Sequence, residues 1–180
     1  MKTFDPGEIE VSIRHWIEKI VVGEGFCPFA APVFRQNRIR YALAEGNSSE
    51  QLLEGFAVQL YQLQLEPKIS TTLYIFPVQL KDFIDFLDHL ELAESLLEQL
   101  GFEGFFQIAN FHPEYQFADT ELDDPANFTN RAPFPIWQLL RESELTQVLA
   151  NYEEPEQIPE RNIRHARHLG IEYFKEILKR

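Results

Sequence analysis

The sequence predicts an α/β fold for residues 1–180, a single domain whose central, mainly parallel sheet of about three or four strands is built from βαβ units and flanked by helices. Three observations predict it. Strand-like and helix-like segments alternate through the first two thirds of the chain. The 180 residues are enough to bury a core, and 44% of them are apolar. No linker-like segment divides the chain.

A helix is expected first. Residues 5–8 supply an N-cap aspartate, a proline at the first helical position and an acid at the third. Its apolar residues recur at helical spacing: Ile9, Ile13, Trp16, Ile17 and Ile20. Gly23 and Gly25 are expected to end this helix, and the proline-rich residues 26–32 are expected to be irregular.

Three strands and two helices alternate in the next part of the chain. Strands are predicted at 38–43, 70–77 and 104–110, the second from its β-branched and aromatic residues. Two helices are predicted between the strands. The first is capped by Ser48/Ser49, and the second covers 81–100. The strands begin about 33 residues apart, which is the length of a βαβ unit.

Two helices are expected to finish the chain. The first would start at Pro135 and bury several apolar residues, namely Ile136, Trp137, Leu139, Leu140, Val148 and Leu149. A short acidic connector at 153–159 follows, and the second helix would run from about Glu160 to Lys179.

Charge and cysteine content exclude several classes of function. The chain has 16 Lys+Arg and 29 Asp+Glu, and the net charge of −13 is unfavourable for nonspecific nucleic-acid binding. One cysteine permits neither an intramolecular disulfide nor a multi-cysteine zinc site. The sequence has no signal-peptide pattern and no apolar run as long as a membrane span. We therefore expect a cytoplasmic protein with neither a nucleic-acid nor a membrane partner.

Residues 110–135 form the first candidate for a functional site. They show neither helical nor strand periodicity, and loops of this length are usually functional or disordered. Disordered segments contain few aromatic residues, whereas this one contains five: Phe111, Tyr115, Phe117, Phe128 and Phe134. We therefore expect the stretch to fold against the body of the protein, near the carboxyl ends of the strands, where ligands gather in such sheets.

Two side chains in this stretch carry the chemistry. His112 could exchange a proton near neutral pH, or it could hydrogen-bond the loop backbone. Arg131 is the single cation between Asn110 and Pro135. Its guanidinium could bind a carboxylate or phosphate through two parallel hydrogen bonds, or it could pair with an acid that ties the loop down. The aspartates of the stretch are more typical of turns than of a metal site, so we predict no metal ligand.

Two further features lie outside the stretch. Cys27, the only thiol, is either a nucleophile that needs a histidine from elsewhere in the fold or a small buried apolar residue. Arg161, Arg164, His165 and His168 share one face of the last helix, whereas helix 81–100 is strongly acidic. These are solvated faces, complementary surfaces in a homo-oligomer, or, for Arg161, part of an anion site.

Five strings carry a resemblance to a known family. They are CPFA at 27–30, QIANFHPEYQF at 107–117, NFTNRAPFP at 127–135, LLRE at 139–142 and PERNI at 159–163. Together they resemble the uncharacterised bacterial family named domain of unknown function 1415, over about residues 11–170. Two departures stand out, because the family tends to have a serine where this chain has Ala132 and a histidine where it has Gln138.

The resemblance implies signature residues but no activity. Those residues correspond here to Cys27, His112, Tyr115, Asn127, Thr129, Asn130, Arg131, Arg141, Glu142, Arg161 and Asn162. If the family's histidine at the position of Gln138 were catalytic, activity in this chain would be in doubt.

The sequence thus leads to two hypotheses of function. The first is a small enzyme that acts on an anionic small molecule, by hydrolysis or group transfer, in a site formed by residues 110–135. His112 would be its general acid–base and Cys27 a second candidate for catalysis. The residues that bind the substrate would be Arg131, Asn127, Thr129, Asn130, Tyr115 and Arg161. The alternative is a non-catalytic ligand-sensing or protein-interaction module. Nothing in the sequence identifies a cofactor.

Overall fold

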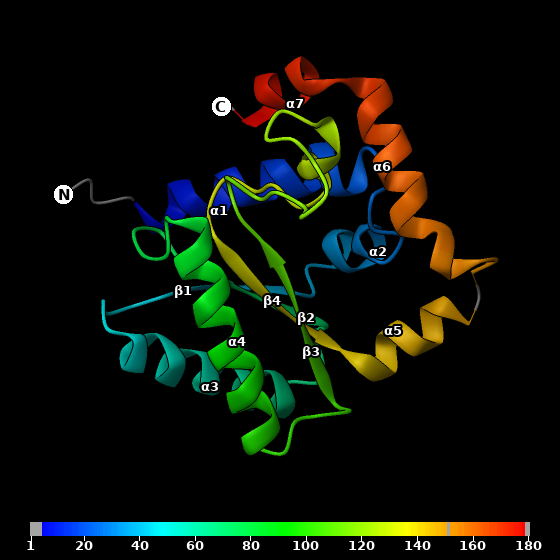
Figure 1. Cartoon of the computed structure of the whole chain (residues 1–180). Helices are drawn as coiled ribbons and strands as arrows, with labels where there is room; N and C mark the ends of the chain where they lie inside the picture. Colours follow the sequence, from blue (N-terminus) through cyan, green and yellow to red (C-terminus); the bar gives the residue numbers. More distant parts are fainter. Residues whose placement is uncertain (1–4, 151, 179–180) are drawn as a thin grey trace.

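A mixed four-stranded sheet forms the centre of the protein (Figure 1). The structure is a computed structural model that describes residues 5–150 and 152–178. The strands lie in the order β1–β2–β4–β3, with the bounds Ile39–Leu43, Thr71–Ile75, Ile136–Arg141 and Phe106–Phe111. β1 and β2 are parallel, whereas β4 is antiparallel to both of its neighbours. The α/β class and the strand number are confirmed, but the sheet is mixed and not mainly parallel.

β4 is the main departure from the expected fold. The chain from Pro135 was predicted to be helical, but residues 136–141 form a strand and only α5, Glu142–Leu149, is a helix. β4 pairs with a strand on each side, and its side chains face both layers of helices. Four of its six residues are apolar, at 136, 137, 139 and 140, and this pattern fits a buried strand as well as a helix. β1, β2 and β3 still run in the same direction, so the predicted βαβ order holds with β4 inserted between β2 and β3.

Two long helices cover one face of the sheet. They are α3, Ser49–Leu65, and α4, Phe83–Gln99. Ser48 caps α3 in a reciprocal capping box with Gln51, and Asp82 caps α4. Their apolar stripes pack on the residues of β2 and β4 that point to this side, among which Trp137 is completely buried.

Shorter helices cover the other face. α1, Pro6–Trp16, continues as a π-helix through Ile17–Val22. The next helix, α2, spans Ala30–Arg35, in a segment that was expected to be irregular. The predicted last helix is two helices, α6, Ile158–Leu169, and α7, Ile171–Leu178, because Gly170 with φ 79° breaks the run. None of the described helices is long and apolar enough to cross a membrane.

The π-helix depends on a glycine at its end. A Cβ atom on Gly23 would lie 2.3 Å from the backbone oxygen of Lys19, which is far inside contact distance. Single π-turns of this kind are frequent at functional sites. Here the turn brings Ile17 and Val21 to the same side of the molecule as the segment that contains Cys27.

Candidate functional site

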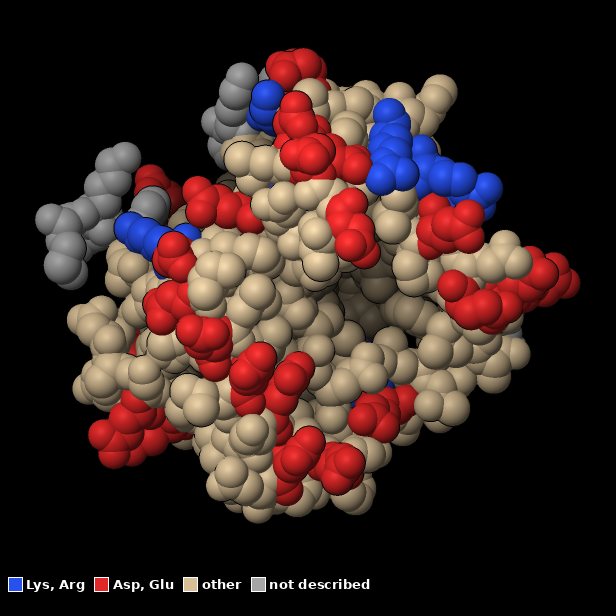
Figure 2. Space-filling view, viewed as in Figure 1, with Lys and Arg blue, Asp and Glu red and all other residues tan. Residues whose placement is uncertain are grey.

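A cavity of about 650 Å³ lies between the sheet and the helices α2, α5 and α6. Figure 2 shows the surface hollowed between α5 and α6, where the cavity opens. Its volume falls within the range of small-molecule sites, roughly 300–1,000 Å³. Most of its wall is apolar.

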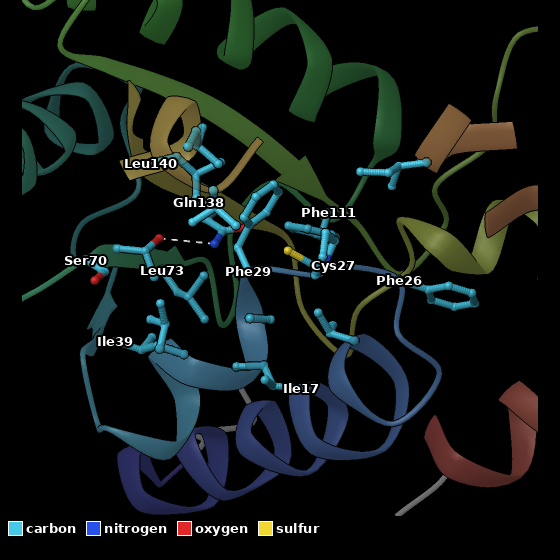
Figure 3. A pocket seen from close by; sticks show the side chains of 18 of the residues that line it. Ile17, Phe26, Cys27, Phe29, Ile39, Ser70, Leu73, Phe111, Gln138 and Leu140 are labelled. Carbon is cyan, nitrogen blue, oxygen red and sulfur yellow. Dashed lines mark hydrogen bonds between the residues drawn. The ribbon is translucent and has the colours of Figure 1, made fainter. Parts of the chain in front are cut away.

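The sheet forms the floor of the cavity. Ile39, Leu73, Gln138 and Leu140 come from three adjacent strands and point to one side, because alternate residues of a strand share a face (Figure 3). The Gln138 side-chain amide donates a hydrogen bond of 3.1 Å to the hydroxyl of Thr71. Since α2 has only six residues, it leaves this part of the sheet incompletely covered. The position at which the resembled family tends to have a histidine is therefore on the floor of the cavity.

Two buried polar side chains in the cavity wall have no hydrogen-bond partner among the described residues. They are Trp16, whose indole N–H is unpaired, and Ser70, whose hydroxyl is unpaired. Trp16 is 3% exposed and Ser70 is 4% exposed. A buried donor without a partner costs about 1–3 kcal/mol, so such groups in a cavity wall are candidates to bind a ligand or water.

One end of the cavity is charged. We call it the charged end and define it by Arg38, Ser70, Arg141 and Glu144. Arg38 Nη2 lies 3.1 Å from a carboxylate oxygen of Glu144, and Arg141 Nε lies 3.9 Å from the same oxygen. Arg141 also donates hydrogen bonds to the backbone oxygens of Leu63, Glu66 and Ile69. The first two of these oxygens lie at the C-terminal end of helix α3.

Cys27 lies in the wall of the cavity on the segment between the π-helix and α2 (Figure 3). Burial raises the pKa of the Cys27 thiol, and backbone N–H groups of Phe29 and Ala30 offset only part of that rise. A thiol with a raised pKa is protonated at neutral pH, whereas the thiolate is the nucleophile. The geometry therefore offers a thiol that a ligand can contact and does not support an activated nucleophile.

We expect iodoacetamide to modify Cys27 of the folded protein at pH 7 at least about tenfold more slowly than in denaturant, because only the thiolate reacts. The rate should keep rising with pH beyond about 8.5, where an ordinary thiol is half ionised. Mass spectrometry of quenched samples measures both rates. A rate that levels off below that pH would identify an activated cysteine instead.

Residues 112–135 are folded against the body of the protein, as the aromatic content predicted. A short 3-10 helix at Pro125–Thr129 lies in their middle and buries Asn127 and Phe128. The ring of Phe128 stacks on Phe174 of α7 at a centroid distance of 4.9 Å. The stretch is therefore anchored in the core by its 3-10 helix, while residues 121–123 remain exposed.

His112 is completely buried and has a backbone partner for each ring nitrogen. Nδ1 accepts a hydrogen bond of 3.0 Å from the N–H of Glu114, and Nε2 donates one of 3.0 Å to the backbone oxygen of Leu80. Desolvation by burial lowers its pKa, so the ring is neutral at pH 7. His112 does not line the cavity. This geometry matches the alternative in which the histidine bonds backbone, and it does not support a general acid–base.

Arg131 also bonds backbone. It donates from Nε to the oxygen of Tyr115 at 3.0 Å and from Nη2 to the oxygen of Leu122 at 2.8 Å. Its guanidinium lies over the ring of Phe128, 4.6 Å from the centroid. Asn127 accepts from Phe117 N–H and donates to the oxygen of Glu121, at 3.0 and 2.9 Å. Arg131, Asn127 and Tyr115 thus close the loop on itself, and none of the three lines the cavity.

Three of the expected site residues do line the cavity, namely Cys27, Thr129 and Asn130. Arg161 does not, since it donates to the backbone oxygen of Gly25 at 3.1 Å on the outer side of α6. Its neighbour Asn162 lines the cavity and donates to the oxygen of Phe26 at 2.7 Å. The expected residues are therefore divided between the loop interior and the cavity.

Some charged residues of α6 contact acidic residues of the same chain. Arg167 of α6 forms an ion pair of 2.7 Å with Asp124, and His165 lies 2.9 Å from Glu24. Figure 2 shows acidic side chains spread along α4 and basic ones gathered at α6. A homo-oligomer through these two faces stays a prediction.

Several site residues were missed from the sequence. Trp16 was assigned to a core stripe, and Arg38, Ser70 and Glu144 received no role. Their positions in the sequence are ordinary, and only the pairing of β1 with β2 and the turn into α5 bring them together. Arg141 was found only through the resemblance.

The comparisons with known proteins agree with the resemblance. A model of the family described as "Protein of unknown function (DUF1415)" matches residues 8–176. No curated protein and no solved structure matches the chain. Within residues 5–150 and 152–178, no group of three or more His, Cys, Asp or Glu side chains is placed to hold a metal ion.

Proposed function

This chain belongs to the DUF1415 family of proteins of unknown function, and we propose that it binds a small molecule with a largely apolar body in the cavity. The observation that carries the proposal is the pair of unpartnered polar groups, Trp16 N–H and Ser70 O–H, in an otherwise mostly apolar wall. A few polar groups in an apolar cavity are the usual composition of a ligand site.

The geometry supports the ligand-binding module over the acid–base enzyme. The enzyme hypothesis needs His112 to exchange a proton with a substrate, but both of its ring nitrogens already have backbone partners. It also needs Arg131 to face a substrate, whereas the hydrogen bonds of Arg131 go to loop carbonyls.

The two tryptophans allow a direct test, because they lie on opposite faces of the sheet. Trp16 lines the cavity and Trp137 packs under α3 and α4. In a Trp137→Phe variant Trp16 is the only tryptophan. We expect 1-anilinonaphthalene-8-sulfonate to bind this variant at one site and to quench Trp16 fluorescence by energy transfer, because the dye would lie beside the indole.

Filling the cavity should abolish this signal. Val33 and Leu140 line the cavity, and replacing both with phenylalanine places two rings in its empty space. We expect the dye to bind at least about tenfold more weakly, a loss of about 1.4 kcal/mol. The matched control carries Val58→Phe and Leu92→Phe, on the exposed faces of the two helices across the sheet. Unchanged dye binding in the filled variant, or equal loss in the control, would contradict the proposal.

A further inference from the structure

We infer that the ligand of this cavity is an anionic amphiphile, whose carboxylate is bound at the charged end and whose apolar body lies on the sheet toward Trp16. This inference rests on the proposed function and names the class of ligand. It is carried by three observations: the charge of the cavity wall, the unpartnered hydroxyl of Ser70 and the apolar path along the cavity floor from Arg141 toward Trp16.

The charge of the cavity wall is opposite in sign to that of the protein. The chain has a net charge of −13. The charged residues that line the cavity are Arg38, Arg141 and Glu144, which sum to +1. One carboxylate would neutralise this cluster, whereas a cation would add to an excess of positive charge in a partly desolvated place.

Ser70 lies between the two arginines. Its backbone N–H donates to the backbone oxygen of Arg38 at 2.9 Å, and the preceding residue, Ile69, accepts a hydrogen bond of 2.9 Å from Arg141 Nε. The Ser70 hydroxyl is buried without a partner. A carboxylate oxygen at this place would accept the hydroxyl hydrogen bond and approach the Arg38 guanidinium. Arg141, whose donors are taken by backbone oxygens, would contribute only its charge.

The floor of the cavity then sets the shape of the rest of the ligand. Arg141 and Ile136 are the two ends of β4, and Ile136 pairs with Phe111, which packs edge-on against Trp16 at 5.1 Å. The ladder between these ends is about 17 Å long at ~3.4 Å per residue. Leu140 and Leu73 line the way between them, so an extended apolar chain fits the space.

The test compares three molecules that share an eight-carbon chain: octanoate, octanol and octylamine. Calorimetry and Trp16 fluorescence in the Trp137→Phe variant measure their affinities. We expect octanoate to bind at least about fivefold more tightly than octanol, and octylamine to bind most weakly, because the head groups differ only in charge and hydrogen bonding.

Two charge variants should act in opposite directions. Arg38→Gln removes one positive charge and should weaken octanoate about fivefold, whereas Glu144→Gln removes the competing carboxylate and should strengthen it about fivefold. Octanol should change by less than about twofold in both. A general disturbance of the site would weaken both probes in both variants and would overturn the inference.

Ser70→Ala has a matched control two residues further along the chain, in β2. The Thr72 hydroxyl is also buried and unpartnered, but Thr72 does not line the cavity, because it shares the face of Tyr74, which packs toward α3 and α4. We expect Ser70→Ala to weaken octanoate about threefold to tenfold without lowering stability, because the hydroxyl it removes has no partner in the free protein. Thr72→Val should leave octanoate binding unchanged.

The outcomes separate the two proposals. Equal binding of octanoate and octanol, with no effect of the charge variants, would overturn the inference that the ligand is anionic. The proposal that the cavity binds an apolar molecule would still stand. Preferential binding of octylamine would overturn the anionic ligand as well. Octanoate binding that survives Val33→Phe with Leu140→Phe would place it outside the cavity and refute the inference. Absence of binding by all three probes and by the dye would overturn both proposals.

Discussion

Replacing His112 with alanine is expected to lower the free energy of unfolding by about 3–4 kcal/mol while leaving the cavity able to bind 1-anilinonaphthalene-8-sulfonate. The imidazole is completely buried, contacts the rings of Phe83 and Phe86, and bonds two backbone groups. Its loss leaves a void and unpaired N–H and C=O groups. It also releases the carbonyl of Leu80, which has the unusual φ of 50°. Chemical denaturation measures the change.

The control for this prediction is His168→Ala, a histidine on the exposed side of α6. It should leave stability nearly unchanged. If His112→Ala folded as stably as the wild type and lost dye binding, the ring would act in the ligand site and its structural role would be refuted.

The same residue makes stability depend on pH. Burial lowers the pKa of His112 below its ordinary value of 6.5, so between the two values the unfolded chain binds a proton that the folded chain does not. The contribution of His112 to stability is therefore present above about pH 6.5 and is lost as the pH falls below it. We expect wild type to lose more stability between pH 7 and pH 5 than His112→Gln, because glutamine does not titrate there.

Replacing Arg131 with alanine is expected to cost about 2–4 kcal/mol and to open the loop to proteases. Arg131 is 9% exposed, and its guanidinium joins Tyr115 to Leu122 across the loop and covers the ring of Phe128. Its removal takes a donor from each of two carbonyls and leaves Leu122 only the longer bond of 3.5 Å from Asn127. Thermal denaturation and limited proteolysis with peptide mapping check the result.

Arg131→Lys should recover only part of that loss, because an ammonium group cannot reproduce the planar fork that reaches both carbonyls. Arg167→Ala is the matched control, since Arg167 contacts the same loop at Asp124 but lies at the surface. It should leave the loop resistant to proteases. If Arg131→Ala kept full stability while octanoate binding was lost, Arg131 would be an anion clamp and not a structural link.

Local patterns predicted the parts of the fold that depend on local interactions. The predicted capping residues Asp5 and Ser48 do cap helices, and the three strands that alternate with helices have the expected order and direction. Caps and periodicity are properties of neighbouring residues, so one sequence contains them. The segment 136–141 contains no such signal, because the pattern of its four apolar residues fits a strand and a helix equally. Its conformation follows from the vacant place between β2 and β3.

Features of contiguous residues were easier to predict from the sequence than the residues that meet at the cavity. The three strands that alternate with helices, the ordered loop 112–135 and the family membership all followed from residue patterns, since each is encoded in contiguous residues, whereas α2 and β4 were not predicted. For His112 the sequence left a ligand or the loop backbone open, and the coordinates show the backbone. For Arg131 it left a ligand or an acidic side chain open, whereas the guanidinium donates to two backbone carbonyls. Only the tertiary structure placed Trp16, Ser70 and Cys27 around one cavity. These residues come from the end of a helix, the residue before a strand and a connecting segment, and their approach is decided by how the layers pack and by the gap that a short α2 leaves over the sheet.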